Sequence, residues 1–173
     1  MADIEISTLP PNQQLVNLIN RDNNKNFLLE EVLLSEPVPV VYNNRNTMIT
    51  VTASPGSKYM GSKDFYYNRL SLNKFGYTGI MSEVPLTRED ILGMVAIQKQ
   101  VDLWPDEFET FIVPVLEEGE VGKIQLRAKS NAIKWLGETE IEYLFKLPDN
   151  LDLLHQLLHF TLPDTFTSVL NPP

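Results

Sequence analysis

An approximate internal repeat is the sequence feature that most constrains how this chain can fold. Ile49 aligns with Ile124 at an offset of 75 residues, and residues 15–19 align with residues 91–95 at an offset of 76. A nearly fixed period of this kind indicates that one supersecondary unit occurs twice. The alternative is that two unrelated α+β segments share common patterns by chance.

The first copy combines a helix pattern with a strand pattern. Leu15, Leu18 and Ile19 have the i, i+3, i+4 spacing of one apolar helix face. Residues 48–53 alternate and are rich in β-branched side chains, which is typical of a strand. Residues 54–57 (Ser-Pro-Gly-Ser) predict a turn, because proline fixes φ at its first central position and glycine accepts a positive φ at the next.

The second copy repeats this order. Thr87 and Asp90 have the spacing of a capping box at a helix start. Residues 122–128 alternate as a strand, and residues 138–143 are expected to pair with them. We therefore predict an α+β fold of two tandem related units, each a helix followed by a small antiparallel sheet, plus an apolar C-terminal tail. Such small units bury little surface alone, so we expect them to share a core or to dock face to face.

The charge distribution supports the same division. The net charge is -9, yet residues 1–75 carry seven acidic and seven basic side chains, whereas residues 76–173 carry sixteen acidic and seven basic ones. We expect a neutral first unit at residues 1–75, an acidic second unit at 76–148 and a docking tail at 149–173. The acidic half is either a solvated surface or a surface that meets a basic partner.

Two features predict contacts with partners. The tail is more apolar than a free chain end, so it is expected to pack across the units or to dock on a partner subunit. Pro39 and Pro114 lie in predicted strands, where a residue without an N–H suits a sheet edge that a neighbour can cap. Besides these prolines, the candidate partner-binding residues are Leu154, Leu158, Phe160, Leu162, Phe166, Val169 and Leu170.

Residues that carry catalysis or hold metals are scarce. The chain has no cysteine, which excludes a cysteine nucleophile and a cysteine zinc site. His155 and His159 have the spacing of zinc-binding histidines, but Gln156 replaces the glutamate that would follow. We expect them to be polar helix positions, and we expect no metal, no cofactor and no small-molecule substrate.

Acidic residues cluster in two short segments, 106–109 and 117–120. A pair of carboxylates can hydrolyse glycosidic bonds when one is desolvated and the other lies opposite it. We expect both segments to be solvated surface and the protein not to be an enzyme. The alternative from another class is a small hydrolase that uses these acidic loops.

Binding to nucleic acid or membranes is not expected either. One pattern for stacking single-stranded nucleic acid is present in the aromatic residues Tyr59, Phe65, Tyr66 and Tyr67, with Lys58, Lys63 and Arg69 nearby. The net charge of -9 opposes that function, so these residues are expected to serve packing or a protein interface. No apolar stretch approaches the roughly 20 residues of a membrane span. The acidic start, Met1–Glu5, predicts no signal peptide.

Residues 46–62, closed by Tyr66–Leu70, resemble a module of virion structural proteins in large contractile-tailed bacteriophages. The shared features are an Asn-Thr start, an Ala-x-Pro-Gly-Ser turn and a Tyr-Asn-Arg ending, preceded by a Leu-Ile-Asn helix. The resemblance covers roughly residues 12–72. In the second half it is faint, because Ser130–Asn131 replaces Pro-Gly.

The resemblance implies a particle-building role with no catalytic residues. The expected function is a virion structural protein in the contractile tail, baseplate or neck, and the alternative is a capsid decoration protein. The expected partners are other virion proteins and copies of the chain itself in a symmetric assembly. The expected location is the virion, after synthesis in the host cytoplasm.

Overall fold

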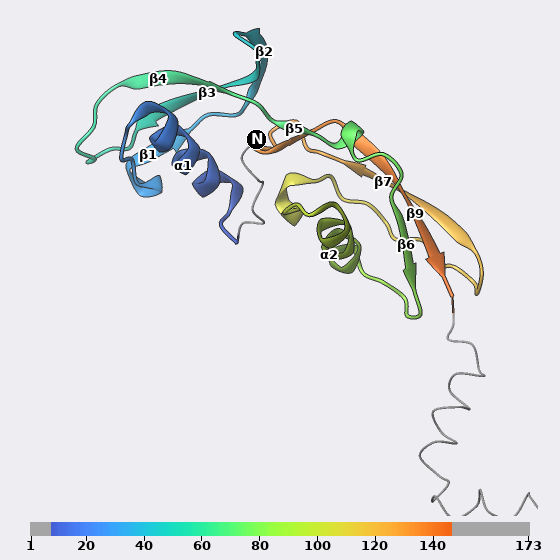
Figure 1. Ribbon diagram of the computed structural model, residues 1–173. Helices are drawn as coiled ribbons and strands as arrows, with labels where there is room; N and C mark the ends of the chain where they lie inside the picture. The colour runs from blue at the N-terminus through green and yellow to red at the C-terminus, as the bar shows by residue number, and fades with distance from the viewer. Residues whose placement is uncertain (1–7, 147–173) are drawn as a thin grey trace, which may run out of the picture.

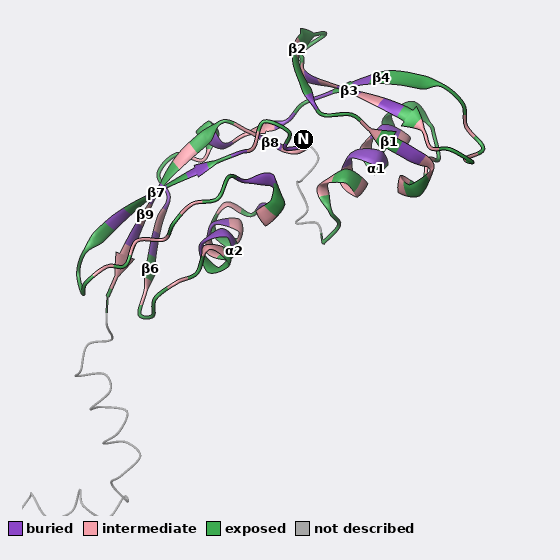
Figure 2. Cartoon of the chain, turned by 180° about the vertical axis from the view of Figure 1, so that it is seen from behind, coloured by how far each residue is buried: buried purple, intermediate pink, exposed green. Residues whose placement is uncertain are grey.

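The computed structural model describes residues 8–146, which form two lobes, each with its own hydrophobic core. The N-terminal lobe (residues 8–69) and the C-terminal lobe (residues 70–146) lie next to each other (Figure 1). In each lobe the buried residues gather on one α-helix and on the strands that face it (Figure 2).

The N-terminal lobe packs one helix on an antiparallel sheet. Its elements are α1 (Pro11–Asn23), the 3-10 turn η1 (Leu29–Glu31), β1 (Val32–Leu34), β2 (Val38–Tyr42), β3 (Arg45–Ala53) and β4 (Ser62–Tyr67). The long strand β3 pairs with β4 along one side and with β1 and β2 along the other. Leu15, Val16 and Ile19 of α1 form the core with residues such as Ile49 and Phe65. The apolar helix face predicted from Leu15, Leu18 and Ile19 is confirmed, with Leu18 only partly buried against the core.

The C-terminal lobe packs one helix on a mixed sheet. Its elements are β5 (Leu70–Ser71), η2 (Leu72–Lys74), β6 (Gly79–Ser82), α2 (Arg88–Lys99), η3 (Pro105–Glu107), β7 (Val121–Arg127), β8 (Trp135–Leu136) and β9 (Glu138–Phe145). The sheet order is β6-β9-β7, with β6 parallel and β7 antiparallel to β9. Strands β5 and β8 form a separate parallel pair. The capping box predicted at Thr87 and Asp90 is confirmed at the start of α2.

The predicted fold of two tandem helix-plus-sheet units is wrong. Residues 8–146 contain only two α-helices and are mostly strands in three sheets. The first sheet is entirely antiparallel, whereas in the second a strand precedes α2 and pairs in parallel with β9. Alternation predicts that a segment is a strand but does not say which strand it pairs with. The sequence repeat therefore led to the wrong expectation that both halves form the same arrangement of strands. The predicted C-terminal tail lies outside the described residues.

The lobes are joined by buried polar contacts with the loop of residues 129–134. The Tyr67 hydroxyl donates to the Ile133 carbonyl at 2.8 Å. Arg69, only 7% exposed, donates to the carbonyls of Ser130 and Ala132 at 3.2 and 3.1 Å and to Thr47 Oγ1 at 3.1 Å. A buried guanidinium is tolerated because these acceptors replace water. Arg69 therefore fixes the end of β4 against the C-terminal lobe.

A second set of contacts lies beside the first. The Lys134 ammonium pairs with Asp102 Oδ1 and lies 3.2 Å from Gln14 Oε1, and the Gln14 amide donates to Asp102 Oδ2 at 2.7 Å. The Glu107 carboxylate accepts the backbone N–H groups of Ile133 and Lys134 at 2.7 and 2.8 Å. Because Gln14 belongs to α1 and the other residues belong to the C-terminal lobe, this network holds the two lobes in one orientation. We call both sets of contacts the lobe junction.

Candidate interaction surfaces

One exposed apolar feature of the described residues is a hairpin formed by β2 and the start of β3, here called the arm (residues 38–46). It projects from the N-terminal lobe (Figure 1). Asn43 and Asn44, with φ of 45° and 59°, form its two-residue turn, and such turns suit the twist of a hairpin. Val41 is 100% exposed and Tyr42 is 51% exposed. The arm therefore offers apolar side chains to solvent.

The predicted partner residue Pro39 lies in this arm. It is exposed and pairs with Thr47 in β3. Strand β2 pairs only with β3 among the described strands, so its other edge is open. The ring of Tyr42 lies 4.4 Å, centroid to centroid, from that of Tyr66 in β4. This contact extends the apolar surface of the arm onto the sheet.

The predicted partner residue Pro114 is placed differently. The segment 110–116 runs without strand pairing, so the strand predicted around Pro114 is wrong. A Cβ atom on Gly122 of β7 would come within 2.6 Å of Pro114 Cγ. Pro114 therefore packs closely over β7, where only glycine fits. The residues of this segment that face solvent are Ile112 and Val115, 89% and 101% exposed, which the sequence analysis did not single out.

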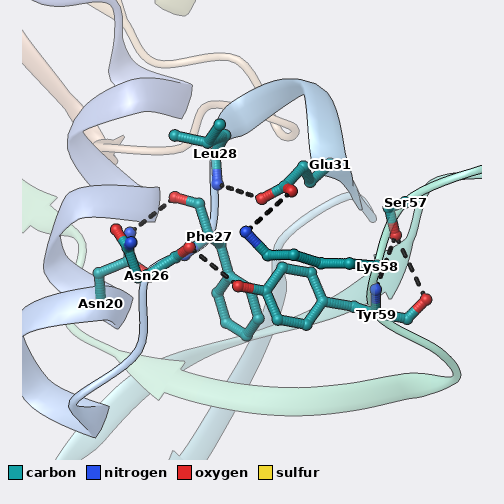
Figure 3. Close-up of polar contacts among 8 residues, drawn as sticks. All are labelled: Asn20, Asn26, Phe27, Leu28, Glu31, Ser57, Lys58 and Tyr59. Atoms are coloured by element: carbon teal, nitrogen blue, oxygen red, sulfur yellow. Dashed lines mark hydrogen bonds and ion pairs between the residues drawn. The ribbon is translucent and has the colours of Figure 1, made fainter.

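The Pro-Gly turn of the predicted module folds back onto the α1–η1 connection (Figure 3). The Tyr59 hydroxyl donates to the Asn26 carbonyl at 2.9 Å. The Tyr59 ring meets the Phe27 ring edge to face, with centroids 4.9 Å apart. The Asn20 side chain accepts from the Phe27 N–H and donates to the Phe27 carbonyl, both at 2.8 Å. These contacts hold the turn and the connection as one rigid wall.

An ion pair closes the same wall. The Lys58 ammonium lies 3.2 Å from Glu31 Oε1, and Glu31 Oε2 accepts the Leu28 backbone N–H at 3.1 Å (Figure 3). The hydrogen bond from the Leu28 N–H lowers the pKa of Glu31 below its usual value, and the nearby Lys58 ammonium lowers it further. The hydrogen bond to Glu31 raises the pKa of Lys58. Lys58 is thus engaged by a carboxylate of its own lobe.

A groove of about 270 Å³ lies beside this wall and is here called the lysine groove. Phe27 and Tyr59 line it together with Phe65 of β4, and Lys25 and Lys63 also belong to its lining. The Lys63 ammonium lies 5.4 Å from the centroid of the Phe65 ring, a cation–π arrangement. Among the described residues that line the groove, none is acidic. The groove therefore combines an apolar interior with positive charge.

The acidic segments are placed as follows. Glu107 is buried in the lobe junction, whereas Asp106 and Glu109 are exposed. In the second segment the Glu117 backbone N–H donates to Glu120 Oε2 at 2.9 Å, which stabilises a turn at the surface. Within residues 8–146, no three histidine or acidic side chains lie close enough together to hold a metal ion.

Several predicted residues lie outside the described range. They are His155 and His159 and the tail residues Leu154, Leu158, Phe160, Leu162, Phe166, Val169 and Leu170. Within the described part of the chain, no helix is long and apolar enough to cross a membrane. The candidate surfaces that the structure describes are therefore the arm, the exposed side of segment 110–116 and the lysine groove.

A comparison with known families identifies the group to which the chain belongs. A family of unknown function (DUF7941) matches residues 4–158, so the chain is a member of that family. The comparison with curated proteins gave no significant match, and neither did the comparison with solved structures.

Proposed function

We propose that this protein is a non-catalytic structural subunit of a bacteriophage virion, assembled through protein–protein contacts in the contractile tail, baseplate or neck. The observation that carries the proposal is the arm, whose apolar side chains project into solvent on an open-edged strand. The resemblance of residues 12–72 to a module of virion structural proteins supports the same function.

The arm suits assembly for two physical reasons. Scattered apolar residues are normal on a surface, but here the projecting hairpin exposes Val41 and Tyr42, which are consecutive in β2 and so lie on its opposite faces. Tyr66 extends the apolar surface on the Tyr42 side. The open edge of β2 also presents backbone groups to which a neighbouring strand can add. A partner that covers the arm would bury apolar area and satisfy the strand edge at the same time.

Purified particles provide the test. Imaging with symmetry assigned should locate the protein at defined, symmetry-related positions in the tail, baseplate or neck. A protein that is abundant in infected cells but missing from purified particles would contradict the proposal. A position on the outer capsid surface would instead identify a decoration protein.

The role of the arm can be tested with a matched pair of variants. Val41→Lys should fold normally but fail to enter particles, because a charge at the arm cannot be buried against a partner. Ile97→Lys is the control, since Ile97 is also an exposed apolar residue, 76% exposed, but lies on α2. Equal incorporation of the two variants would show that the arm is not the assembly surface.

A further inference from the structure

We propose that the lysine groove of one copy binds the C-terminal segment, residues 149–170, of a neighbouring copy, so that copies associate head to tail. This inference rests on the proposed function and adds one specific contact between subunits.

The groove is built to receive an apolar group. Phe27 is held by the Asn20 side chain and Tyr59 by the Asn26 carbonyl, so one wall is rigid before any ligand arrives. Preorganised side chains lose little entropy on binding. At about 270 Å³ the groove is slightly smaller than typical small-molecule pockets. It therefore suits one or two side chains of a peptide as an anchor.

The charge of the groove is unusual for this chain. Two lysines and no acidic residue line it, although the whole chain has a net charge of -9. Lys58 lies nearby but is paired with Glu31, so the charge offered to a ligand comes from Lys25 and Lys63. The groove therefore favours an apolar segment that carries negative charge.

Residues 149–170 have this composition. They contain Asp149, Asp152 and Asp164 and no lysine or arginine. Leucine, phenylalanine and valine make up much of the rest, including Leu158 and Phe160. The segment thus matches the groove in both polarity and charge.

The position where the described chain ends favours a neighbouring copy as the source of the segment. Strand β9 ends at Phe145, at the end of the C-terminal lobe that faces away from the N-terminal lobe (Figure 1). The groove lies at the α1–η1 connection and the β3–β4 turn, at the opposite end of the molecule. Within one copy the segment would have to run back along both lobes. A contact between different surfaces of two copies repeats into a ring or a filament.

The test exchanges charges between groove and segment in the full-length chain. The groove variant carries Lys25→Glu and Lys63→Glu, and the segment variant carries Asp149→Lys, Asp152→Lys and Asp164→Lys. Sedimentation velocity should show concentration-dependent association of the wild type. The dissociation constant of the association should rise at least about tenfold for each variant alone, because like charges then meet at the contact. A mixture of the two variants should associate again, since every groove then finds a segment of opposite charge on the other variant.

The control variant carries Arg21→Glu and Lys74→Glu, which changes the net charge as much as the groove variant but lies outside the groove lining. It should associate like the wild type, and circular dichroism should show that all variants are folded. The proposal is overturned if the wild type stays monomeric, if the mixture is not rescued or if the control is weakened equally. A monomeric protein that is still found in purified particles would refute this contact alone, whereas reciprocal rescue without particle incorporation would refute the virion function alone.

Discussion

The two lobes differ in sheet topology and in the side chains on the face of the sheet that points away from the helix. On the outer face of the C-terminal sheet, ion pairs join Lys123 to Glu140 at 2.6 Å and Arg127 to Glu138 at 2.7 Å. The corresponding region of the N-terminal lobe carries the Tyr42–Tyr66 pair and the apolar arm. The ion-paired part of the C-terminal sheet is therefore a charged surface that suits water, whereas the corresponding part of the N-terminal lobe is suited to contact a partner.

The cores differ as well. The C-terminal core contains fifteen buried hydrophobic residues and the N-terminal core contains eight. Because hydrophobic stabilisation scales with buried apolar area, the C-terminal lobe should be the more stable of the two. The lobe junction then lets it support the smaller lobe.

Removing the largest side chain of the C-terminal core should destabilise both lobes. Trp135 is 1% exposed and its indole N–H donates to the Asp102 carbonyl at 3.2 Å. Trp135→Ala should lower the free energy of unfolding by about 3–5 kcal/mol. Hydrogen exchange should show faster exchange in β3 and β9 alike. The corresponding change in the smaller core, Ile49→Ala, should accelerate exchange mainly in the N-terminal lobe. Faster exchange throughout β9 in that variant would show that the C-terminal lobe also depends on the N-terminal lobe for its stability.

Breaking the lobe junction should uncouple the lobes. Arg69→Met removes the donors to the part-buried Ser130 carbonyl, to the buried Ala132 carbonyl and to Thr47 Oγ1. Each buried acceptor left without a partner costs about 1–3 kcal/mol. Denaturation followed by hydrogen exchange should change from one transition to two, with the N-terminal lobe unfolding first. Arg69→Lys keeps the charge and should weaken the coupling less, and coincident transitions in Arg69→Met would show that the lobes are held together by other contacts.

The helix starts provide a smaller test, because only one of them has a side-chain cap. The Thr87 hydroxyl accepts the Asp90 N–H, whereas Pro10 before α1 offers no side-chain acceptor. Thr87→Ala should cost about 1 kcal/mol of stability in urea unfolding. Thr87→Ser should cost little, since it keeps the hydroxyl. An unchanged midpoint for Thr87→Ala would mean that α2 is held by packing alone.

The smallest change in stability should come from protonating Glu31, which lies beside the lysine groove. The Leu28 N–H and Lys58 lower the pKa of Glu31 below its ordinary value of 4.5. The ionised Glu31 carboxylate therefore contributes its full stabilisation above about pH 4.5. This contribution is lost as the pH falls through the pKa that Glu31 has in the folded protein, which is lower than 4.5. The melting temperature of wild type should fall slightly more between pH 6 and pH 3 than that of Glu31→Gln. Identical pH profiles would show that the ion pair adds no stability.

Much of the local structure could be predicted from the sequence, because the signals are local. The spacing of Leu15, Leu18 and Ile19 predicts the helix face, and Thr87 predicts the start of α2. The pairing of β6 with β9 could not be predicted, since alternation contains no information about distant partners.

The candidate surfaces were predicted only in part. Pro39 was correctly expected on an edge strand, whereas Pro114 packs against β7. The cluster of Tyr59, Phe65 and Lys63 was recognised in the sequence, but its junction with Lys25 and Phe27 depends on how the β3–β4 turn folds back. Tyr59 of the β3–β4 turn and Phe27 of the α1–η1 connection can be assigned to one groove only when the path of the chain is known.

The parallel pairing of β6 with β9 also determines the order in which the chain can fold during translation. The strands β1 to β4 all pair within a short stretch, so the N-terminal sheet can form as soon as Tyr67 has left the ribosome. Strand β6, in contrast, emerges long before its partner, because Ile80 must wait for Tyr143. Such non-local pairings form slowly. The smaller lobe is thus synthesised first and its sheet can form first, but its contacts with Ile133 and the rest of the lobe junction are completed only when nearly all of residues 8–146 have been made.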